Sequence, residues 1–360
     1  MFAEYIPTLQ PLTARRLGRR AVLVRVLAWR SAAFHLNFKL SAFSDLPDRP
    51  MHPYRLIIPT YQAQPHLAAL LPALKNQGLD PRAVLVIDSS SNDDTVKIFR
   101  DFGADVRVIP KAEFNHGGTR RKAVSLCGDS ELLILLTQDA IPTAGAFGRL
   151  LHEFENPSLG LAYGRQLPRQ QARAIERHAR LANYPPAPAQ VRSFGDRFTY
   201  GIKTIFCSNS FAAYRRSALE AVGGFPEDAF FAEDQITAGR MLESGWNLAY
   251  VPEAGVVHSH GHSPLDDFRR YFDVGVFHAR NPWLLETFGT AEGEGMKFVR
   301  SELRYLLHEE PLSIASAFLR SVLKYVGYRA GRAERWLAPW AKARLSMAPH
   351  YWRAASGSSD

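Results

Sequence analysis

The fold class is decided by the stretch Glu131-Leu132-Leu133-Ile134-Leu135-Leu136-Thr137-Gln138-Asp139. Its almost unbroken apolar run is typical of a strand that is buried on both faces of a parallel sheet. The run is followed by the carboxylate of Asp139, and ligands of such sheets bind outside the carboxyl ends of the strands. We therefore expect a buried strand over residues 131–136, with Asp139 at the ligand-binding edge.

The residues before this strand alternate between apolar runs and helical patterns. We predict strands at Leu56–Ile58, Ala83–Ile87 and Val106–Ile109, and helices at 64–76, 93–102 and 118–126. Strands that alternate with helices over short connections are typical of a doubly wound α/β protein. The sequence therefore predicts a mostly parallel sheet flanked by helices, and Pro142 is expected to start the helix after the fourth strand.

The composition limits the class of protein. The chain has 360 residues, of which 46% are hydrophobic and 22% charged, enough for one large domain or two ordinary ones with a buried core. Its apolar runs stay far below the ~20 residues of a membrane-spanning helix. The two cysteines, Cys127 and Cys207, exclude a disulfide framework and a zinc site of four thiolates.

The net charge of +9 is concentrated at the two ends of the chain. Residues 1–50 carry eight Lys and Arg against three Asp and Glu, and residues 297–360 carry eleven against five. Basic ends favour an anionic partner, either a membrane surface or a nucleic acid. We expect residues 1–50 to be a basic extension that could form a membrane-surface helix, with Met51 as an alternative start of the chain.

The second basic end is expected to form a helical region over residues 266–353, followed by a disordered tail over 354–360. Apolar residues recur there at helical spacing: Ala315, Phe318, Leu319, Val322, Leu323 and Val326. Basic residues and indoles lie beside this stripe: Arg320, Lys324, Arg329, Arg332, Arg335, Trp336 and Trp340. The combination favours docking on an anionic membrane, and packing of the stripe on the rest of the protein is the alternative.

Polar residues follow the predicted strands where a ligand is expected. Thr60 and Tyr61 follow the first strand, Asp88 closes the second, and Gly117-Gly118-Thr119-Arg120 follows the third. The first strand-to-helix turn lacks the glycines of a dinucleotide fingerprint, which argues against a nicotinamide dehydrogenase. The glycine pair looks like part of the phosphate loop of sugar-nucleotide pyrophosphorylases, but in those enzymes that loop follows the first strand.

Three carboxylates are candidates for the chemistry. Asp88 could accept the imide N–H of a pyrimidine, or serve only as a turn residue. Asp139 could hold Mg²⁺ or Mn²⁺ beside a diphosphate, because such ions take one or two carboxylates together with phosphate oxygens. Asp234, in the stretch Phe230–Gln235 at a predicted helix start, could act as a general base, and capping of the helix is its alternative role.

Three histidines recur at alternate positions in the stretch Val256-Val257-His258-Ser259-His260-Gly261-His262. On an extended segment they share one face. No cysteine pair or helical histidine pair accompanies them to form a dedicated zinc site. We expect one of them, His258 or His260, to complete the metal ligands around Asp139.

The predicted strands and helices, together with the candidate polar residues and in this order, resemble the inverting glycosyltransferases of family 2, which have a GT-A fold, over residues 54–264. Five strings are similar to bacterial rhamnosyltransferases in particular: Phe114–Arg120, Leu136–Ala140, Tyr163–Pro168, Gly275–Arg280 and Lys324–Arg329. Each string alone is weak, but five in register are specific. The resemblance implies a GT-A domain over residues 51–265.

The resemblance also implies roles for individual residues. The donor-binding residues would be Thr60, Tyr61 and Asp88 for base and ribose, Arg120 for the neighbouring nucleotide region, and Gln166 for the sugars. Asp234 would be the catalytic base, and Asp139 with His258 would bind the metal. The family's Asp-x-Asp motif corresponds here to Thr137-Gln138-Asp139, so one anionic metal ligand is missing.

The residues and the resemblance together predict transfer of L-rhamnose from dTDP-L-rhamnose to a hydroxyl group of a growing cell-surface glycan, free or lipid-linked. The expected place is the inner face of the cytoplasmic membrane, with peripheral attachment and no nucleic-acid partner. Two alternatives stay open: a family-2 enzyme with a UDP-hexose or UDP-hexosamine donor, and an inactive glycan-binding protein of the same fold. The thymine methyl contributes only ~1–3 kcal/mol in a pocket, so the residues alone do not separate the donors.

Overall fold

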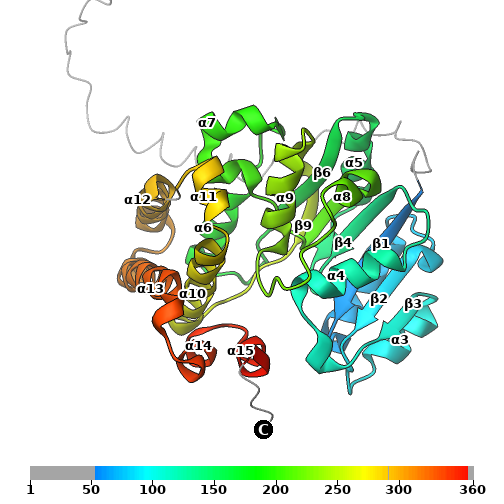
Figure 1. Ribbon diagram of the computed structural model, residues 1–360, viewed down its shortest axis with the longest axis horizontal. Helices are drawn as coiled ribbons and strands as arrows, with labels where there is room; N and C mark the ends of the chain where they lie inside the picture. The colour runs from blue at the N-terminus through cyan, green and yellow to red at the C-terminus, as the bar shows by residue number, and fades with distance from the viewer. Residues whose placement is uncertain (1–52, 291, 356–360) are drawn as a thin grey trace, which may run out of the picture. The chain divides into compact units, whose positions relative to one another are not determined.

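A computed structural model describes residues 53–290 and 292–355 of the chain (Figure 1). The predicted basic extension over residues 1–50 lies outside the described residues, as do residues 356–360 of the predicted tail. Residues 354 and 355 of that tail belong to the last helix, α15 (Pro349–Ala355), so the helical region continues two residues further than expected.

The described residues contain one mixed sheet of nine strands. The strands are β1 (Tyr54–Thr60), β2 (Val84–Asp88), β3 (Asp105–Val108), β4 (Leu132–Leu136), β5 (Ile141–Pro142), β6 (Leu159–Leu167), β7 (Gln190–Arg192), β8 (Phe211–Arg215) and β9 (Asn247–Val257). Their order is β3-β2-β1-β4-β8-β6-β9-β5, and β7 also pairs with β9. All strands share one direction except β8, β5 and β7, which are antiparallel to their neighbours. The expected mostly parallel α/β sheet is confirmed, with one reversed strand, β8, inserted near its centre.

Helices cover both faces of this sheet and continue beyond it. The helices of the sheet region are α2 (Gln64–Lys75), α3 (Thr95–Phe102), α4 (His116–Ser125), α5 (Ala146–His152), α6 (Ala174–Asn183), α7 (Arg197–Tyr200), α8 (Arg216–Ala221) and α9 (Glu233–Glu243). The helices after it are α10 (Pro264–Arg280), α11 (Pro282–Phe288), α12 (Glu292–Glu309), α13 (Ile314–Arg332), α14 (Pro339–Leu345) and α15. The expected helical C-terminal extension is therefore confirmed.

The elements predicted up to β4 are present, with ends within two residues of the expected ones. The expectation that Pro142 starts a helix is wrong. Ile141–Pro142 pairs with Val256–Val257 as the edge strand β5, and α5 begins only at Ala146. Proline is tolerated there because an edge strand does not need the N–H group that proline lacks.

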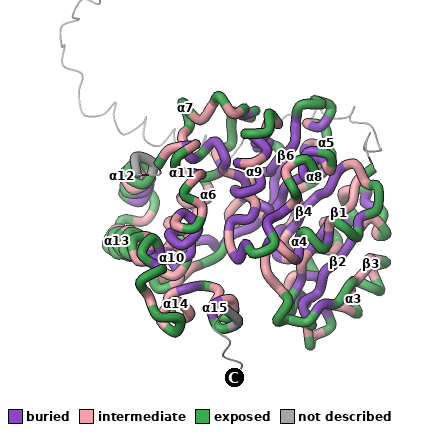
Figure 2. The backbone as a smooth tube through the Cα atoms, in the orientation of Figure 1, coloured by how far each residue is buried: buried purple, intermediate pink, exposed green. Residues whose placement is uncertain are grey.

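The two faces of the central strands pack into two separate cores, as the alternation of side chains along a strand requires. On β4, Leu133 and Leu135 belong to the cluster that includes residues of α4, α8 and α9. Leu132, Ile134 and Leu136 belong to the cluster with residues of α2, α3 and α5. These five side chains are at most 1% exposed, and Figure 2 shows the central strands as the most continuously buried part of the chain.

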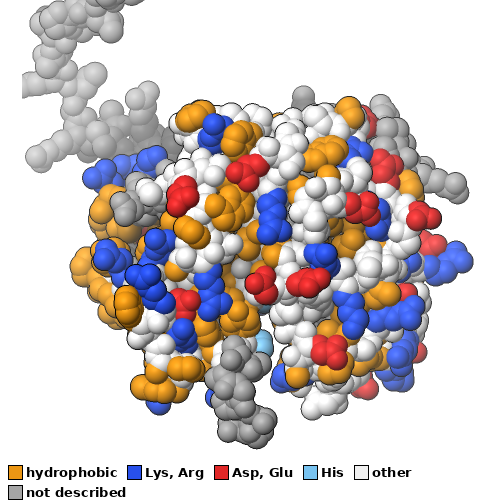
Figure 3. All heavy atoms as spheres, viewed as in Figure 1, with side chains coloured by type: hydrophobic (Ala, Val, Ile, Leu, Met, Phe, Trp, Pro, Cys, Tyr) orange, Lys and Arg blue, Asp and Glu red, His pale blue; other side chains and the backbone are white. Residues whose placement is uncertain are grey.

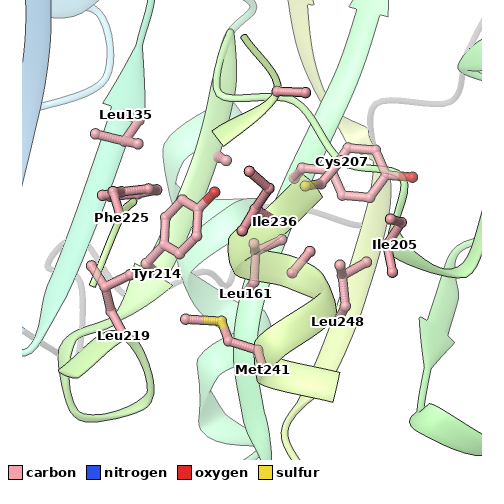
Figure 4. Packing of buried hydrophobic residues seen from close by; sticks show 14 of the residues in the cluster. Leu135, Leu161, Ile205, Cys207, Tyr214, Leu219, Phe225, Ile236, Met241 and Leu248 are labelled. Carbon is pink, nitrogen blue, oxygen red and sulfur yellow. The ribbon is translucent and has the colours of Figure 1, made fainter. Parts of the chain in front are cut away.

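Figure 4 shows the first of these clusters from close by. Ile236 and Met241 of α9 lie in one cluster with Leu161 of β6 and Leu248 of β9. Because α9 begins with Glu233, this packing anchors on the sheet the helix that carries the predicted base, Asp234.

The C-terminal helices α10 and α13 pack against each other through glycines. A Cβ atom on Gly327 would collide with the carbonyl oxygen of Phe268, and one on Gly331 with that of Phe272. Only glycine lets the two backbones approach this closely. The contact joins α13 firmly to α10, and within the described part of the chain the apolar residues Phe318, Leu319, Val322, Tyr325 and Val326 of α13 stay exposed (Figure 2).

Two of the basic residues beside the apolar stripe of α13 form hydrogen bonds with other elements, Arg320 being partly buried and Arg332 exposed. Arg320 donates to Oδ2 of Asp267 (2.6 Å) and to the carbonyl oxygen of His262 (2.9 Å). Arg332 donates to the carbonyl oxygen of His278 (2.9 Å). Across residues 53–290 and 292–355, no helix combines the length and hydropathy that crossing a bilayer requires.

Candidate active site

A cleft of about 2720 Å³ opens at the edge where β4, β6 and β9 end. Asp139 after β4, Gln166 of β6 and His258 after β9 line it on the side of the sheet, and residues of α6, α10 and α13 line it as well. Because these three strands run in the same direction, their carboxyl ends meet at one edge. This is the edge at which an α/β sheet is expected to bind its ligand.

Asp139, His258 and His260 form a cluster in this cleft. Nε2 of His258 lies 3.4 Å from Oδ1 of Asp139, Nε2 of His260 lies 3.3 Å from Oδ2, and the two Nε2 atoms are 3.1 Å apart. Ligand atoms at right angles on an ion roughly 2.1 Å away lie about 3.0 Å apart, so this spacing suits ligands of one cation. The prediction left the choice between His258 and His260 open, and the structure brings both of them to Asp139.

Gln166 determines which nitrogen of His258 faces the cluster. Nε2 of Gln166 donates to Oγ of Ser208 (2.9 Å), and its Oε1 therefore accepts from Nδ1–H of His258 (3.0 Å). A histidine with its proton on Nδ1 presents a lone pair on Nε2, as a metal ligand must. The predicted contact of Gln166 with the sugars stays a prediction, and its observed contacts place it behind His258.

The protonation of the cluster also suits a cation. Burial alone would raise the pKa of Asp139, but the hydrogen bond with His258 and the charges of both histidines hold that pKa below its usual range. Burial and the neighbouring His258 lower the pKa of His260 to about 4. At neutral pH the cluster therefore offers a carboxylate and the neutral imidazole of His260, which Mg²⁺ and Mn²⁺ accept as ligands.

Asp234 lies at the start of α9, as predicted. Its Oδ1 accepts from the backbone N–H of Gln235 (2.8 Å), and its Oδ2 accepts from the backbone N–H of Asn209 (3.2 Å). Ala232, immediately before the helix, has a φ of +55°, a left-handed conformation that is costly for a residue with a Cβ atom. Such strain persists only where surrounding contacts hold the chain, so the position of Asp234 depends on its neighbours.

Aromatic rings of the last helix supply part of that support. Phe230, two residues before Ala232, is stacked on Tyr351 of α15 with 4.5 Å between ring centroids, and Trp352 meets it edge-on at 5.7 Å. Arg280 of α10 donates to Oη of Tyr351 (2.8 Å) and lies 4.8 Å from the ring centroid of Trp352. The C-terminal extension is thus built into the loop that precedes the predicted base.

A buried charge network adjoins Asp234. The carboxylate of Glu233 pairs with Nε of Arg120 (3.2 Å) and accepts from Nδ2 of Asn209 (2.9 Å). Burial, followed by the charge of Glu233, raises the pKa of Asp234 above the ordinary carboxyl range. Arg120 was predicted to lie beside the nucleotide, but it is only 4% exposed and does not line the cleft; its guanidinium contacts Glu233 and the carbonyl oxygen of His116 instead.

The other predicted donor-binding residues lie at the ends of β1 and β2. Asp88 accepts hydrogen bonds from the hydroxyl of Thr60 (2.8 Å) and from the backbone N–H (2.8 Å) and hydroxyl (2.7 Å) of Ser91. Asp88 is 0% exposed, so a direct contact with a base requires Thr60 or Ser91 to move aside. Tyr61 is 38% exposed and its Oη accepts from Lys111 (2.7 Å), so its ring offers the open surface on which a base can stack.

Comparisons with known proteins give relatives over most of the chain. A family model described as glycosyl transferase family 2 matches residues 56–223. The O-antigen chain rhamnosyltransferase WbaN of Salmonella anatum is 42% identical over 312 residues, 86% of this chain and 99% of that protein. The O-antigen chain rhamnosyltransferase RfbN of Salmonella typhimurium is 43% identical over 307 residues, 85% of this chain and 98% of that protein. The chain belongs to glycosyl transferase family 2.

Membership of family 2 makes the protein a glycosyltransferase and confirms the resemblance found in the sequence. An N-acetylglucosaminyl-diphospho-decaprenol L-rhamnosyltransferase of Mycobacterium tuberculosis is 26% identical over 234 residues, 57% of this chain and 75% of that protein. Among solved structures, the mannosyltransferase PcManGT of Pyrobaculum calidifontis, in complex with GDP-Man and Mn²⁺, is 18% identical with a TM-score of 0.50 and covers 92% of this chain and 93% of that chain. The structural likeness concerns the fold and agrees with the expected GT-A type.

Sequence reasoning missed two groups of residues in this glycosyltransferase site. Asn209 contacts both Glu233 and Asp234, and Ser208 holds Gln166; the signal for both was the polar triplet Ser208-Asn209-Ser210 directly before an apolar strand. Arg180 of α6 and Arg270 of α10 also line the cleft. They are ninety residues apart on helices with many other basic residues, so no pattern in the sequence singles them out.

Proposed function

We propose that this glycosyltransferase transfers L-rhamnose from dTDP-L-rhamnose to a hydroxyl group of a growing cell-surface glycan, with inversion at the anomeric carbon. The observation that carries the choice of sugar is the 42–43% identity with two O-antigen chain rhamnosyltransferases over 98–99% of their length. The thymine base follows from the sugar, because the residues at the ends of β1 and β2 do not themselves distinguish thymine from uracil.

In the proposed reaction, Asp234 takes the proton of the acceptor hydroxyl as the oxygen attacks the anomeric carbon opposite the diphosphate. The new carbon–oxygen bond forms, the bond to dTDP breaks, and the proton stays on the carboxylate. The raised pKa of Asp234 suits this role, because a base whose pKa lies nearer the working pH holds the proton more firmly in the transition state. A single displacement needs one such carboxylate, unlike glycoside hydrolysis with its pair.

We propose Mg²⁺ or Mn²⁺ as the ion for Asp139, His258 and His260. When bound, such an ion offsets the charge that develops on the departing diphosphate. Gln166 and Ser208 keep His258 in the form that a metal ligand needs. His260 makes up in number for the carboxylate that the Thr137-Gln138-Asp139 triplet lacks, so the cluster still offers three protein ligands.

We propose a lipid-linked glycan as the acceptor and an anionic membrane surface as the place where it is met. Apolar side chains of α12, α13 and the turn between them are 42–97% exposed: Met296, Leu303, Leu307, Leu312, Phe318, Leu319, Val322, Tyr325 and Val326. The exposed basic residues Arg300, Arg304 and Arg329 lie on the same helices, and Figure 3 shows hydrophobic and basic side chains together over this part of the molecule. Apolar surface beside basic charge is typical of helices that lie in a membrane interface, where each basic residue contributes roughly 1 kcal/mol.

Attachment would be to the inner face of the cytoplasmic membrane, and flotation with anionic liposomes tests it. We expect the full chain to float at low salt and to be released at high salt, since exposed charges are screened. Phe318→Glu combined with Val322→Glu should prevent flotation, because both side chains are exposed and their loss leaves the core intact. Val191→Glu, a change at an exposed position of β7, is the matched control. Equal flotation of all three proteins would contradict the docking surface.

Donor hydrolysis tests the transfer itself. Purified protein is supplied in turn with dTDP-L-rhamnose, UDP-glucose, UDP-N-acetylglucosamine and GDP-mannose in the presence of Mg²⁺ or Mn²⁺, and released nucleotide is measured. We expect the highest kcat/KM with dTDP-L-rhamnose. Preference for a UDP-sugar would replace the donor and keep the enzyme class, whereas no turnover with any donor, with or without a glycan acceptor, would favour a glycan-binding protein.

A further inference from the structure

Two arginines line the cleft without an acidic partner. Arg180 of α6 and Arg270 of α10 both contribute to its wall. Among the described residues neither guanidinium takes part in a hydrogen bond or an ion pair, and Nε of Arg180 is shielded from solvent with no partner. Arg270 is exposed, and its Cζ lies 5.8 Å from the ring centroid of Phe231. Both guanidinium groups therefore keep donors for something that enters the cleft.

The two positive charges also destabilise each other. Burial, with the charge of Arg270 adding to it, lowers the pKa of Arg180 below its usual value, although Tyr184, Glu176 and Asp139 act in the opposite direction. By contrast, Arg320 in the same cleft forms an ion pair with Asp267, in which Nη1 lies 2.6 Å from Oδ2. Cations held together without an anion cost stability, and a phosphate relieves that cost with charge-assisted hydrogen bonds.

The position of the pair lies between the reaction centre and the exposed helix. Tyr184 lies one turn after Arg180. Burial raises the pKa of Tyr184, and the nearby carboxylate of Asp234 raises it further. In the other direction the cleft wall continues through Tyr271 to Lys324 and Tyr325 of α13. Tyr325 is 62% exposed on the face proposed to meet the membrane. The wall of one cleft therefore includes Gln235, the residue after the predicted base, the two arginines, and Tyr325 on that face.

Two diphosphates could supply the anion. The donor diphosphate already has a place, because Asp139, His258 and His260 offer it a cation. An acceptor that is joined to its lipid through a diphosphate brings a second one, and it would lie between the sugar at the base and the lipid at the membrane. Gln235 beside Asp234, the arginine pair and residues of α13 all line the cleft, so its wall has surfaces for all three parts of such an acceptor.

We infer that Arg180 and Arg270 bind the diphosphate that joins the acceptor glycan to its lipid carrier. This rests on the proposed function and adds to it the class of the acceptor's linkage and the residues that recognise it. Guanidinium groups present paired N–H donors to phosphate oxygens, and they keep their charge when half-buried. The arginine pair would fix how far the acceptor hydroxyl lies from the lipid, and so which sugar of a lipid-linked glycan reaches Asp234.

Binding of farnesyl diphosphate, measured by equilibrium dialysis of the labelled compound, tests the inference. The full chain is first saturated with dTDP and Mn²⁺, so that the donor site is filled. We expect farnesyl diphosphate to bind, farnesol to bind at least tenfold more weakly, and Arg180→Gln and Arg270→Gln each to weaken binding of the diphosphate by about tenfold. Arg177→Gln, a change on the same helix at a residue that does not line the cleft, should leave its affinity unchanged.

Several results would overturn the inference. They are no binding of farnesyl diphosphate, equal binding of farnesol, or unchanged affinity in both arginine variants with native circular dichroism. If the two variants lose affinity for dTDP and keep that for farnesyl diphosphate, the arginines serve the donor and the inference is wrong. Release of dTDP from dTDP-L-rhamnose by the wild type is measured in parallel. Its absence contradicts the proposed function, whereas its presence together with any of the results above contradicts only the acceptor site.

Discussion

The two aspartates of the candidate active site, Asp139 and Asp234, have opposite electrostatic surroundings. Asp139 faces two histidines, which hold its pKa below the usual range although it is largely buried. Asp234 adjoins Glu233, and burial together with that negative charge raises its pKa. One residue type thus becomes a permanent anion in one place and a proton acceptor in the other. The neighbouring charged groups determine whether an aspartate stays ionised or accepts a proton. A sequence motif that consists of the aspartate alone does not include these neighbours.

The two centres also differ in how they are held. The Asp139 cluster is built from side chains that follow β4 and β9, and Gln166 of β6 orients one of them. Asp234 is held by backbone N–H groups and by a strained helix start. The first centre is therefore sensitive to the chemistry of its side chains, and the second to the charge and packing behind it.

The strongest test of this contrast is Asp234→Asn. The amide keeps the shape but accepts no proton, so transfer should fall by a factor on the order of 10²–10⁴. Affinity for dTDP, measured by calorimetry, should change little because the metal cluster is intact. Transfer at a near wild-type rate would remove Asp234 from the role of base.

Asp139→Ala should have the second largest effect, and of a different kind. Loss of the carboxylate should lower the rate by about 10²–10³ and weaken dTDP binding together with it, because the cation loses its anionic ligand. EDTA should reproduce the effect in the wild type. Asp129→Ala, at an exposed turn, is the control. Full activity in excess chelator would exclude the cluster from the reaction.

Gln166→Leu sharpens the comparison at the first centre. Without the amide oxygen, Nδ1 of His258 loses its acceptor, and affinity for Mn²⁺ should fall by roughly 10–100-fold. Manganese binding followed by electron paramagnetic resonance measures this directly, and excess Mn²⁺ should restore much of the rate. Unchanged affinity, or a loss of rate that excess metal does not relieve, would contradict the orienting role of Gln166.

The smallest expected effect concerns Asp234: two changes beside it should shift the pH dependence of the rate in opposite directions. Asp234 works as the carboxylate, so the rate falls on the acid side as pH drops through its raised pKa. Arg120→Gln leaves the Glu233 charge unopposed and should move this acid limb to higher pH, whereas Glu233→Gln should move it to lower pH, each by roughly one unit. Each change also leaves a buried charge without its partner, so circular dichroism must confirm folding before the pH profiles are compared. Shifts in the same direction would contradict the network.

The sequence predicted well what short-range patterns determine. The apolar run 132–136, the polar residues after each strand and the helix start at Asp234 all lie where expected, because each depends on neighbours along the chain. The errors have a different cause. Pro142 became part of an edge strand because β9 lies beside it, and local patterns likewise did not show that Arg120, whose predicted role stays a prediction, pairs with Glu233. Both partners are more than a hundred residues away, where local patterns carry no information about pairing.

The stack of Phe230 on Tyr351 has a consequence for the synthesis of the protein. The ribosome makes α15 after every other described element, so a nascent chain can hold the whole sheet, the Asp139 cluster and Asp234 while the loop around Ala232 still lacks its aromatic support. Catalytic competence would then be gained only after α15 has been made. A transcript truncated just before Pro349 should yield a chain that binds metal and nucleotide but holds its base loosely, and a bulky tag fused near Tyr351 should impair turnover more than one placed anywhere on the exposed side of α13.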